Sequence, residues 1–229
     1  MSVALVSRVA VGEVAADEVH AEWRPYHRPA EQSLGVIVGL SHGARPEGYL
    51  RPPYDDEIRA IAGTGAAVVV PGSSGQAWGS PAAVESIDAA VHHLRERMGC
   101  RPRVALLGFS MGALAVCGWA RDHADEVAAL ALVTPALDLR DHRSDPTYGP
   151  EIEAVHGHHP PPSPVDYARD LAGIRTRIWY APADPVIAST TVERFALAHG
   201  TADLVLLDGA DHDPAAVPGV EIAAFLTGP

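Results

Sequence analysis

The stretch Val104-Ala-Leu-Leu-Gly108-Phe109-Ser110-Met111-Gly112 decides the fold of this chain. Its first residues form a short apolar run, which is typical of a strand buried on both faces of a parallel sheet. A G-x-S-x-G pattern follows, and a helix-like segment begins at Met111. Such a turn exposes its serine at the carboxyl edge of the sheet, so we interpret Ser110 as a nucleophile. The alternative is an ordinary glycine-flanked serine between a strand and a helix.

Further apolar runs recur on both sides of this stretch, and they predict a mainly parallel sheet. Two alternating segments, Ala4–Val14 and Glu18–Tyr26, indicate an antiparallel hairpin at the start. The short buried-type runs are Leu34–Leu40, Ala66–Pro71, Arg103–Gly108, Val127–Thr134, Arg177–Ala181 and Asp203–Leu207. Counted with the hairpin, these segments give eight strands.

Helical patterns separate the strands, as expected for right-handed crossovers. Pro81–Met98 is the clearest, with Ser80 as its expected cap. Capping-box spacing between Thr190 and Glu193 predicts another helix that stops at Gly200. The remaining candidates are Asp55–Ala62 and Val220–Leu226. The whole chain, residues 1–229, is predicted to be one domain, interrupted only by an irregular, lid-like insert at about 137–174.

A serine nucleophile needs a general base and an acid that orients the base. His212 follows the last predicted strand, which places it at the same sheet edge as Ser110, and His42 is the rival base. Asp184 follows the seventh strand and is the leading acid, with Asp138 as its rival.

With these residues in this order, the chain resembles the α/β-hydrolase superfamily, and most closely its small serine esterases and dienelactone-hydrolase-like members without a large cap. The resemblance implies a three-layer fold with an eight-stranded, mostly parallel sheet, and a Ser110–Asp184–His212 triad that cleaves ester-type bonds through an acyl-enzyme. The sequence Ser41-His42-Gly43-Ala44 is similar to the family's oxyanion turn. The resemblance therefore implies an oxyanion hole built from the backbone N–H groups of Ala44 and Met111, with His42 structural.

Trp78, Phe109 and His42 are the candidates for the substrate pocket. Trp78 follows the fourth predicted strand, where it either walls an acyl pocket or packs against its own glycine-rich loop. The polar, proline-rich insert lacks a readable helical pattern, so we expect an open, shallow site and a preference for short acyl chains. The insert histidines, His156, His158 and His159, are interpreted as part of a polar loop rather than as metal ligands.

The composition of the chain limits the classes of partner and function that we expect. The formal net charge of −12 disfavours nucleic acid and membrane surfaces as partners. Residues 1–19 lack the features of a signal peptide, which predicts a cytoplasmic location. No cofactor or metal is expected, and the predicted partner is a small acyl ester. Alternative functions on the same triad are thioesterase, peptidase, lipase and lactone hydrolase, and a non-catalytic binding or interaction module is the alternative outside enzymes.

Overall fold

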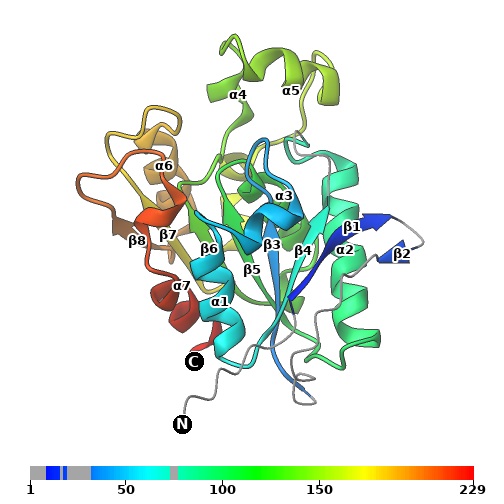
Figure 1. Cartoon of the computed structure of the whole chain (residues 1–229). Coiled ribbons are helices and arrows are strands. Elements are labelled where there is room, and N and C mark those ends of the chain that lie inside the picture. The colour runs from blue at the N-terminus through cyan, green and yellow to red at the C-terminus, as the bar shows by residue number, and fades with distance from the viewer. Residues whose placement is uncertain (1–8, 16–17, 20–31, 73–76) are drawn as a thin grey trace.

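The computed structural model describes residues 9–15, 18–19, 32–72 and 77–229. Their strands are β1 (Val9–Ala15), β2 (Glu18–Val19), β3 (Gly35–Gly39), β4 (Ala67–Gly72), β5 (Val104–Phe109), β6 (Val127–Val133), β7 (Thr176–Tyr180) and β8 (Asp203–Leu206). They form one sheet in the order β2-β1-β4-β3-β5-β6-β7-β8 (Figure 1). Every described strand pair is parallel except β1 with β2. The predicted α/β class with a mostly parallel sheet is confirmed.

The amino-terminal hairpin is only partly as predicted. The β1 and β2 strands pair antiparallel at Val14 with Val19 and at Ala15 with Glu18. The β1 strand also lies parallel to β4, so it joins the main sheet. Residues 4–8 and 20–26 of the predicted hairpin lie outside the described residues.

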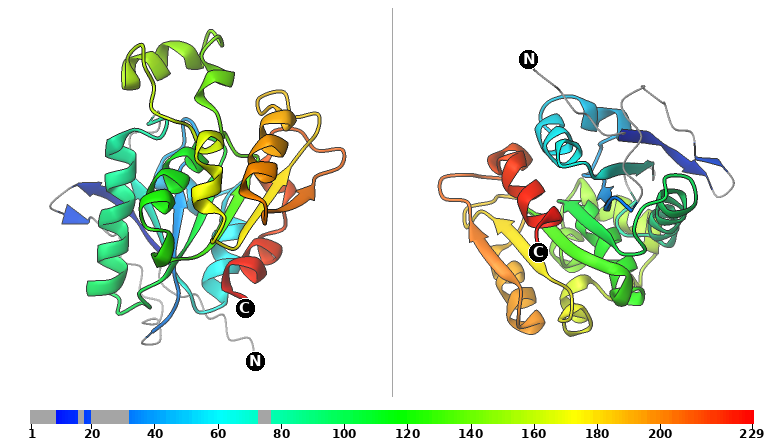
Figure 2. Two further views of the ribbon diagram at one scale, coloured as in Figure 1. Left: turned by 180° about the vertical axis from the view of Figure 1, so that it is seen from behind. Right: turned by 90° about the horizontal axis from the view of Figure 1, so that it is seen from below.

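Helices cover both faces of the sheet, which explains the continuous apolar runs of its strands (Figure 2). Side chains of α2 (Pro81–Glu96), α3 (Gly112–Asp122) and α6 (Ser189–His199) form one hydrophobic core against the sheet. Side chains of α1 (Asp55–Gly63) and α7 (Gly219–Thr227) form a second core on the opposite face.

The ends of α2 and α6 can be compared with the caps predicted from the sequence. Ser80 caps α2 by accepting a hydrogen bond from the Ala83 N–H, as predicted. The α6 helix ends at Gly200, which adopts a left-handed conformation with φ of 82°. The predicted capping box at Thr190 is wrong, because α6 begins at Ser189 after Ala188 and has no side-chain cap.

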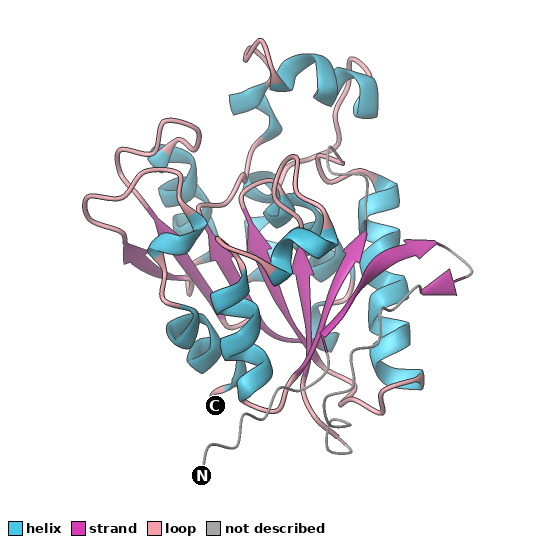
Figure 3. Ribbon diagram, viewed as in Figure 1, coloured by secondary structure: helices cyan, strands magenta, loops and turns pink. Residues whose placement is uncertain are grey.

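The insert at 137–174 is more regular than predicted. It contains α4 (Leu139–His142), α5 (Tyr148–His156) and the 3-10 turns Pro164–Asp166 and Ala168–Leu171. The two helices project beyond the carboxyl edge of the sheet (Figure 3). Asp138 caps α4, and Asp145 accepts the N–H groups of Thr147 and Tyr148 at the start of α5. Helices held by local caps and bearing few buried apolar side chains leave little periodicity in a sequence.

No described helix is long and apolar enough to cross a membrane. Both cysteines, Cys100 and Cys117, are free and buried.

Candidate active site

Ser110 lies at the sharp turn between β5 and α3, as the G-x-S-x-G pattern predicts. Its φ is +46°, in the left-handed region that costs a residue other than glycine energy. Neighbouring backbone holds this conformation, because the Ser110 N–H donates to Val133 O and the Ala136 N–H donates to Ser110 O. A side chain at Gly108 would lie 2.7 Å from Ala113 Cα, so glycine permits the close crossing of β5 and α3.

The structure brings together the three side chains that the sequence singled out. Ser110 Oγ lies 2.9 Å from His212 Nε2, so the hydroxyl donates to that nitrogen. The other ring nitrogen, His212 Nδ1, lies 2.8 Å from Asp184 Oδ2 and donates to the carboxylate. These three residues follow β5, β7 and β8, three strands whose carboxyl ends share one edge of the sheet.

Hydrogen bonds from the backbone fix the carboxylate of Asp184 through the oxygen that does not contact His212. Its side chain is only 1% exposed, and its Oδ1 accepts hydrogen bonds from the N–H groups of Val186 and Ile187 at 2.8 and 2.9 Å. These contacts leave Oδ2 to face His212. A carboxylate fixed in this way selects the tautomer in which His212 Nε2 is bare and able to accept a proton.

Both rival residues take other roles. Asp138 caps α4 and pairs with Arg140 and Arg194, each at 2.7 Å. The guanidinium of Arg140 holds the pKa of the Asp138 carboxyl below its usual range despite burial. His42 donates from Nε2 to Glu151. Among the described residues, neither side chain forms a hydrogen bond with Ser110 or His212.

The oxyanion turn differs from the expectation at Ala44. Its N–H donates to the Ser41 carbonyl at 3.1 Å, closing a turn around Gly43, and Ala44 is not among the residues that line the pocket. The Met111 N–H, by contrast, has no acceptor among the described residues and stands at the amino end of α3. The His42 N–H is likewise without an acceptor in the described part of the chain, and His42 lines the pocket.

Phe109, a predicted pocket residue, does not line the pocket. It is fully buried and packs against Tyr49 and Tyr54 in the core formed with α1 and α7. Alternate residues of a strand point to opposite faces, so Phe109 shares its face with Leu107 rather than with Gly108.

A pocket of about 160 Å³ opens beside the Ser110 hydroxyl. Aromatic, histidine and small side chains from the sheet edge and the insert form its wall. They are Ser41, His42, Tyr54, Trp78, Ser110, Met111, Thr134, Ala136, His142, Tyr148, Val186, Ile187 and His212. Trp78 and His42 therefore lie where the sequence analysis expected a pocket wall.

The insert supplies two pocket residues that sequence reasoning missed, His142 from α4 and Tyr148 from α5. Their rings lie 5.8 Å apart between centroids and contact Trp78 at 5.6 and 5.2 Å respectively. Burial lowers the pKa of His142, which favours its neutral form. The helices of the insert therefore contribute to the wall of the pocket, which the expectation of an open, shallow site did not include.

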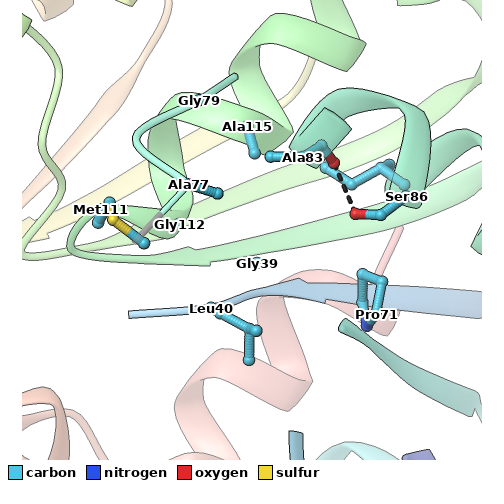
Figure 4. A pocket seen from close by; sticks show the side chains of 11 residues that line it. Gly39, Leu40, Pro71, Ala77, Gly79, Ala83, Ser86, Met111, Gly112 and Ala115 are labelled. Carbon is cyan, nitrogen blue, oxygen red and sulfur yellow. Dashed lines mark hydrogen bonds between the residues drawn. The ribbon is translucent and has the colours of Figure 1, made fainter. Parts of the chain in front are cut away.

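A second, much smaller cavity lies at the start of α3, between that helix and the first residues of α2 (Figure 4). Its volume is about 10 Å³, and Met111, Gly112 and Gly39 contribute to its lining. Ser86 lines it too, but its hydroxyl already donates to the Ala83 carbonyl. A space of that size holds about one water molecule, so it is too small for an acyl group.

The histidines of the insert do not gather into a metal site. His156 Nε2 donates to the Trp78 carbonyl, and His158 pairs with Glu153 on the surface. The described residues include no cluster of three or more His, Cys, Asp or Glu side chains that could hold a metal ion.

Comparison with known proteins agrees with this architecture. Residues 62–160 match the family model described as serine aminopeptidase, S33. No curated protein matches the sequence. Among solved structures, an esterase from Pyrococcus furiosus superimposes with a TM-score of 0.62 at 16% identity, covering 86% of this chain and 84% of the esterase.

Two further structures give the same result. The esterase Est2 from Thermogutta terrifontis, solved with propionate bound, has a TM-score of 0.62 and 21% identity, with 91% of this chain and 89% of Est2 covered. A putative dienelactone hydrolase from Klebsiella pneumoniae has a TM-score of 0.62 and 18% identity, with coverage of 86% and 88%. The chain therefore has the α/β-hydrolase fold that its sequence motifs predicted.

Proposed function

We propose that this protein is a serine hydrolase that cleaves ester-type bonds of small acyl substrates through an acyl-enzyme. The observation that carries the proposal is the continuous hydrogen-bonded chain from Ser110 Oγ through His212 to Asp184, with contacts of 2.9 and 2.8 Å. This series of hydrogen bonds begins at Ser110, which lines a pocket. A serine hydroxyl next to a bare imidazole nitrogen is the arrangement that nucleophilic acyl transfer requires.

In the first half of the proposed reaction, Ser110 Oγ attacks the substrate carbonyl while His212 Nε2 takes the hydroxyl proton. The carboxylate of Asp184 stabilises the imidazolium that results, and His212 then returns the proton to the leaving alcohol. In the second half, His212 takes a proton from water, which attacks the acyl-enzyme and releases the acid. Ser110 recovers its proton from His212 in that step.

The negative charge on the carbonyl oxygen needs backbone donors that are already in place. The free Met111 N–H at the start of α3 is one donor, favoured by the positive end of the helix dipole. Because the Ala44 N–H is engaged by Ser41, we infer that the second donor is the His42 N–H of the same turn.

The size of the pocket favours small acyl groups. A cavity of about 150 Å³ accommodates a molecule of the size of benzene, so about 160 Å³ here suits an acyl group of up to about six carbon atoms. Est2, a structural neighbour, was solved with the short carboxylate propionate, which is in keeping with this class.

The family model names an aminopeptidase, which suggests peptide substrates as the second candidate. Aminopeptidase substrates carry a free ammonium group, which a carboxylate would recognise. The described residues that line the pocket include no Asp or Glu. We therefore favour esters over aminopeptidase substrates.

Labelling with a fluorophosphonate, together with hydrolysis of p-nitrophenyl acetate, tests the proposal. The parent protein should be labelled and active, and Ser110→Ala should lose both properties while keeping its melting temperature. Because the triad acts as a unit, kcat should fall on the order of 10⁴–10⁶-fold. Ser41→Ala removes another serine of the same pocket and should remain labelled. Labelling that persists in Ser110→Ala would contradict the assignment.

A further inference from the structure

Glu151 on α5 joins the insert to two residues at the sheet edge that line the pocket. Its Oε2 accepts a hydrogen bond from His42 Nε2 at 2.7 Å and another from Trp78 Nε1 at 3.0 Å. Glu151 itself is not among the residues that line the pocket, and its side chain is 21% exposed. A single carboxylate oxygen therefore contacts residues 109 and 73 positions away in the sequence.

The α5 helix also holds the backbone of Trp78. His156 Nε2 donates to the Trp78 carbonyl at 2.8 Å. Trp78 has a φ of +40°, a left-handed conformation that is strained for a large side chain and needs support from its surroundings. Glu151 and His156 supply that support, one at the indole N–H and one at the main chain.

The rings of His42, Trp78 and Tyr148 all line the pocket. Tyr148, also on α5, lies 5.0 Å from the His42 ring and 5.2 Å from Trp78 between centroids. His42 and Trp78 are 5.6 Å apart. Movement of α5 away from the sheet would therefore separate Tyr148 from the other two rings and enlarge the pocket.

The other end of the insert is anchored independently of Glu151. Asp138, the cap of α4, pairs with Arg194 of α6 at 2.7 Å. Thr191 of α6 donates to Asp141 of α4 at the same distance. Loss of the Glu151 contacts would therefore loosen α5, which keeps only the His156 bond among its two polar contacts to Trp78, while α4 stays attached to α6.

We propose that Glu151 is a positioning residue that holds α5 against His42 and Trp78 and so sets the upper size limit of the acyl group. The proposal rests on the proposed esterase function and adds a determinant of its specificity. Glu151 acts through His42 and Trp78 and makes no contact with substrate. The two hydrogen bonds end on a charged acceptor, which makes them stronger than bonds between neutral groups.

The test compares Glu151→Ala, Glu151→Gln and Glu153→Ala on p-nitrophenyl acetate and octanoate. Glu153 is the matched control, because it lies on the same helix, is 52% exposed and pairs with His158 on the surface. In Glu151→Ala, KM for the acetate should rise about tenfold with kcat within about threefold, and the acetate-to-octanoate ratio of kcat/KM should fall about tenfold.

The Glu151→Gln variant distinguishes the effect of the hydrogen bonds from the effect of side-chain size. The amide oxygen of Glu151→Gln has two lone pairs and can accept both hydrogen bonds, so this variant should stay within about threefold of the parent. Glu153→Ala should match the parent. An unchanged acyl selectivity in Glu151→Ala would overturn the proposal, as would an equal loss of selectivity in Glu153→Ala.

Hydrogen exchange gives a readout that does not depend on catalysis. Amides of residues 148–156 should exchange about tenfold faster in Glu151→Ala than in the parent, while those of α6 keep their protection. If the parent hydrolyses no ester but Glu151→Ala shows this faster exchange, the proposed function fails and the link between α5 and the sheet edge stands. If exchange in residues 148–156 is unchanged, the proposal about Glu151 is wrong even in an active esterase.

Discussion

A β-carbon added to Gly112 would lie 2.4 Å from the carbonyl carbon of Gly39. This contact lies where the start of α3 meets the end of β3, and both glycines let the turn that carries Ser110 pack against the turn that follows β3. Backbone atoms cannot move aside as a flexible side chain can, so even a methyl group at residue 112 forces the two turns apart.

We therefore expect Gly112→Ala to destabilise the protein by about 1–3 kcal/mol, which lowers the melting temperature by several degrees for a chain of this size. Fluorophosphonate labelling of Ser110 should also slow, because the Met111 N–H is displaced. Gly63→Ala is the control, since a β-carbon there meets nothing within 4 Å. Equal melting temperatures for the parent and Gly112→Ala would show that the crossing is looser than described.

Asp184→Asn should reduce kcat on the order of 10⁴-fold with little change in melting temperature. The amide can donate to His212 Nδ1, which favours the tautomer with a proton on Nε2, and that nitrogen then cannot accept the Ser110 proton. Steady-state hydrolysis of p-nitrophenyl acetate measures the effect. Asp211→Asn, an exposed neighbour of His212, should retain full activity. An Asp184→Asn variant within tenfold of the parent would argue that another group orients His212.

The acyl-chain series should show an early optimum. Each methylene buried in the pocket contributes about 0.8 kcal/mol, or about fourfold in kcat/KM, until the space is filled. With a volume of about 160 Å³, the gain should end at about six carbon atoms. Measurements of kcat/KM from acetate to palmitate esters test this expectation. A steady rise through octanoate and beyond would favour a lipase-like site instead.

Glu57 should make the protein less stable as the pH rises. Burial raises the pKa of this α1 carboxyl to about 7, with further contributions from Asp56, Asp55 and Asp213. In the unfolded chain the pKa is about 4.3, so the native state binds the proton more tightly. The contribution of this group is therefore fully present below about pH 4 and is lost as the pH rises through about 7.

Glu57→Gln should accordingly shrink the difference in melting temperature between pH 5 and pH 8. Thermal denaturation of the parent and variant at both pH values measures it. Glu85→Gln, an exposed change on α2, serves as the control and should leave the pH dependence as in the parent. A Glu57→Gln variant with the parent's pH dependence would mean that Glu57 is ionised at pH 5 in the native protein.

Removal of metal ions should have no effect. The described residues offer no ligand cluster, and the Ser110–His212–Asp184 arrangement needs none. EDTA should therefore change neither ester hydrolysis nor the melting temperature. A loss of activity that zinc restores would direct attention to the insert histidines.

The sequence by itself determined the parts of this protein that depend on local pattern. The buried runs and the glycines around Ser110 predicted the sheet and the nucleophile turn, because a strand covered on both faces and a sharp strand-to-helix crossing each require particular residues in order. Asp184 and His212 could be selected because they directly follow strands, and parallel strands present their carboxyl ends at one edge.

Only the tertiary structure decided the roles that depend on which distant residues meet. Phe109 faces the core because of the pleat of β5, and the Ala44 N–H is consumed by a turn to Ser41. His142, Tyr148 and Glu151 belong to short helices with little apolar periodicity, so nothing in their spacing reveals that they contact Trp78. Their contacts arise where the insert folds back over the sheet edge, and long-range packing of this kind leaves no local signal in the chain.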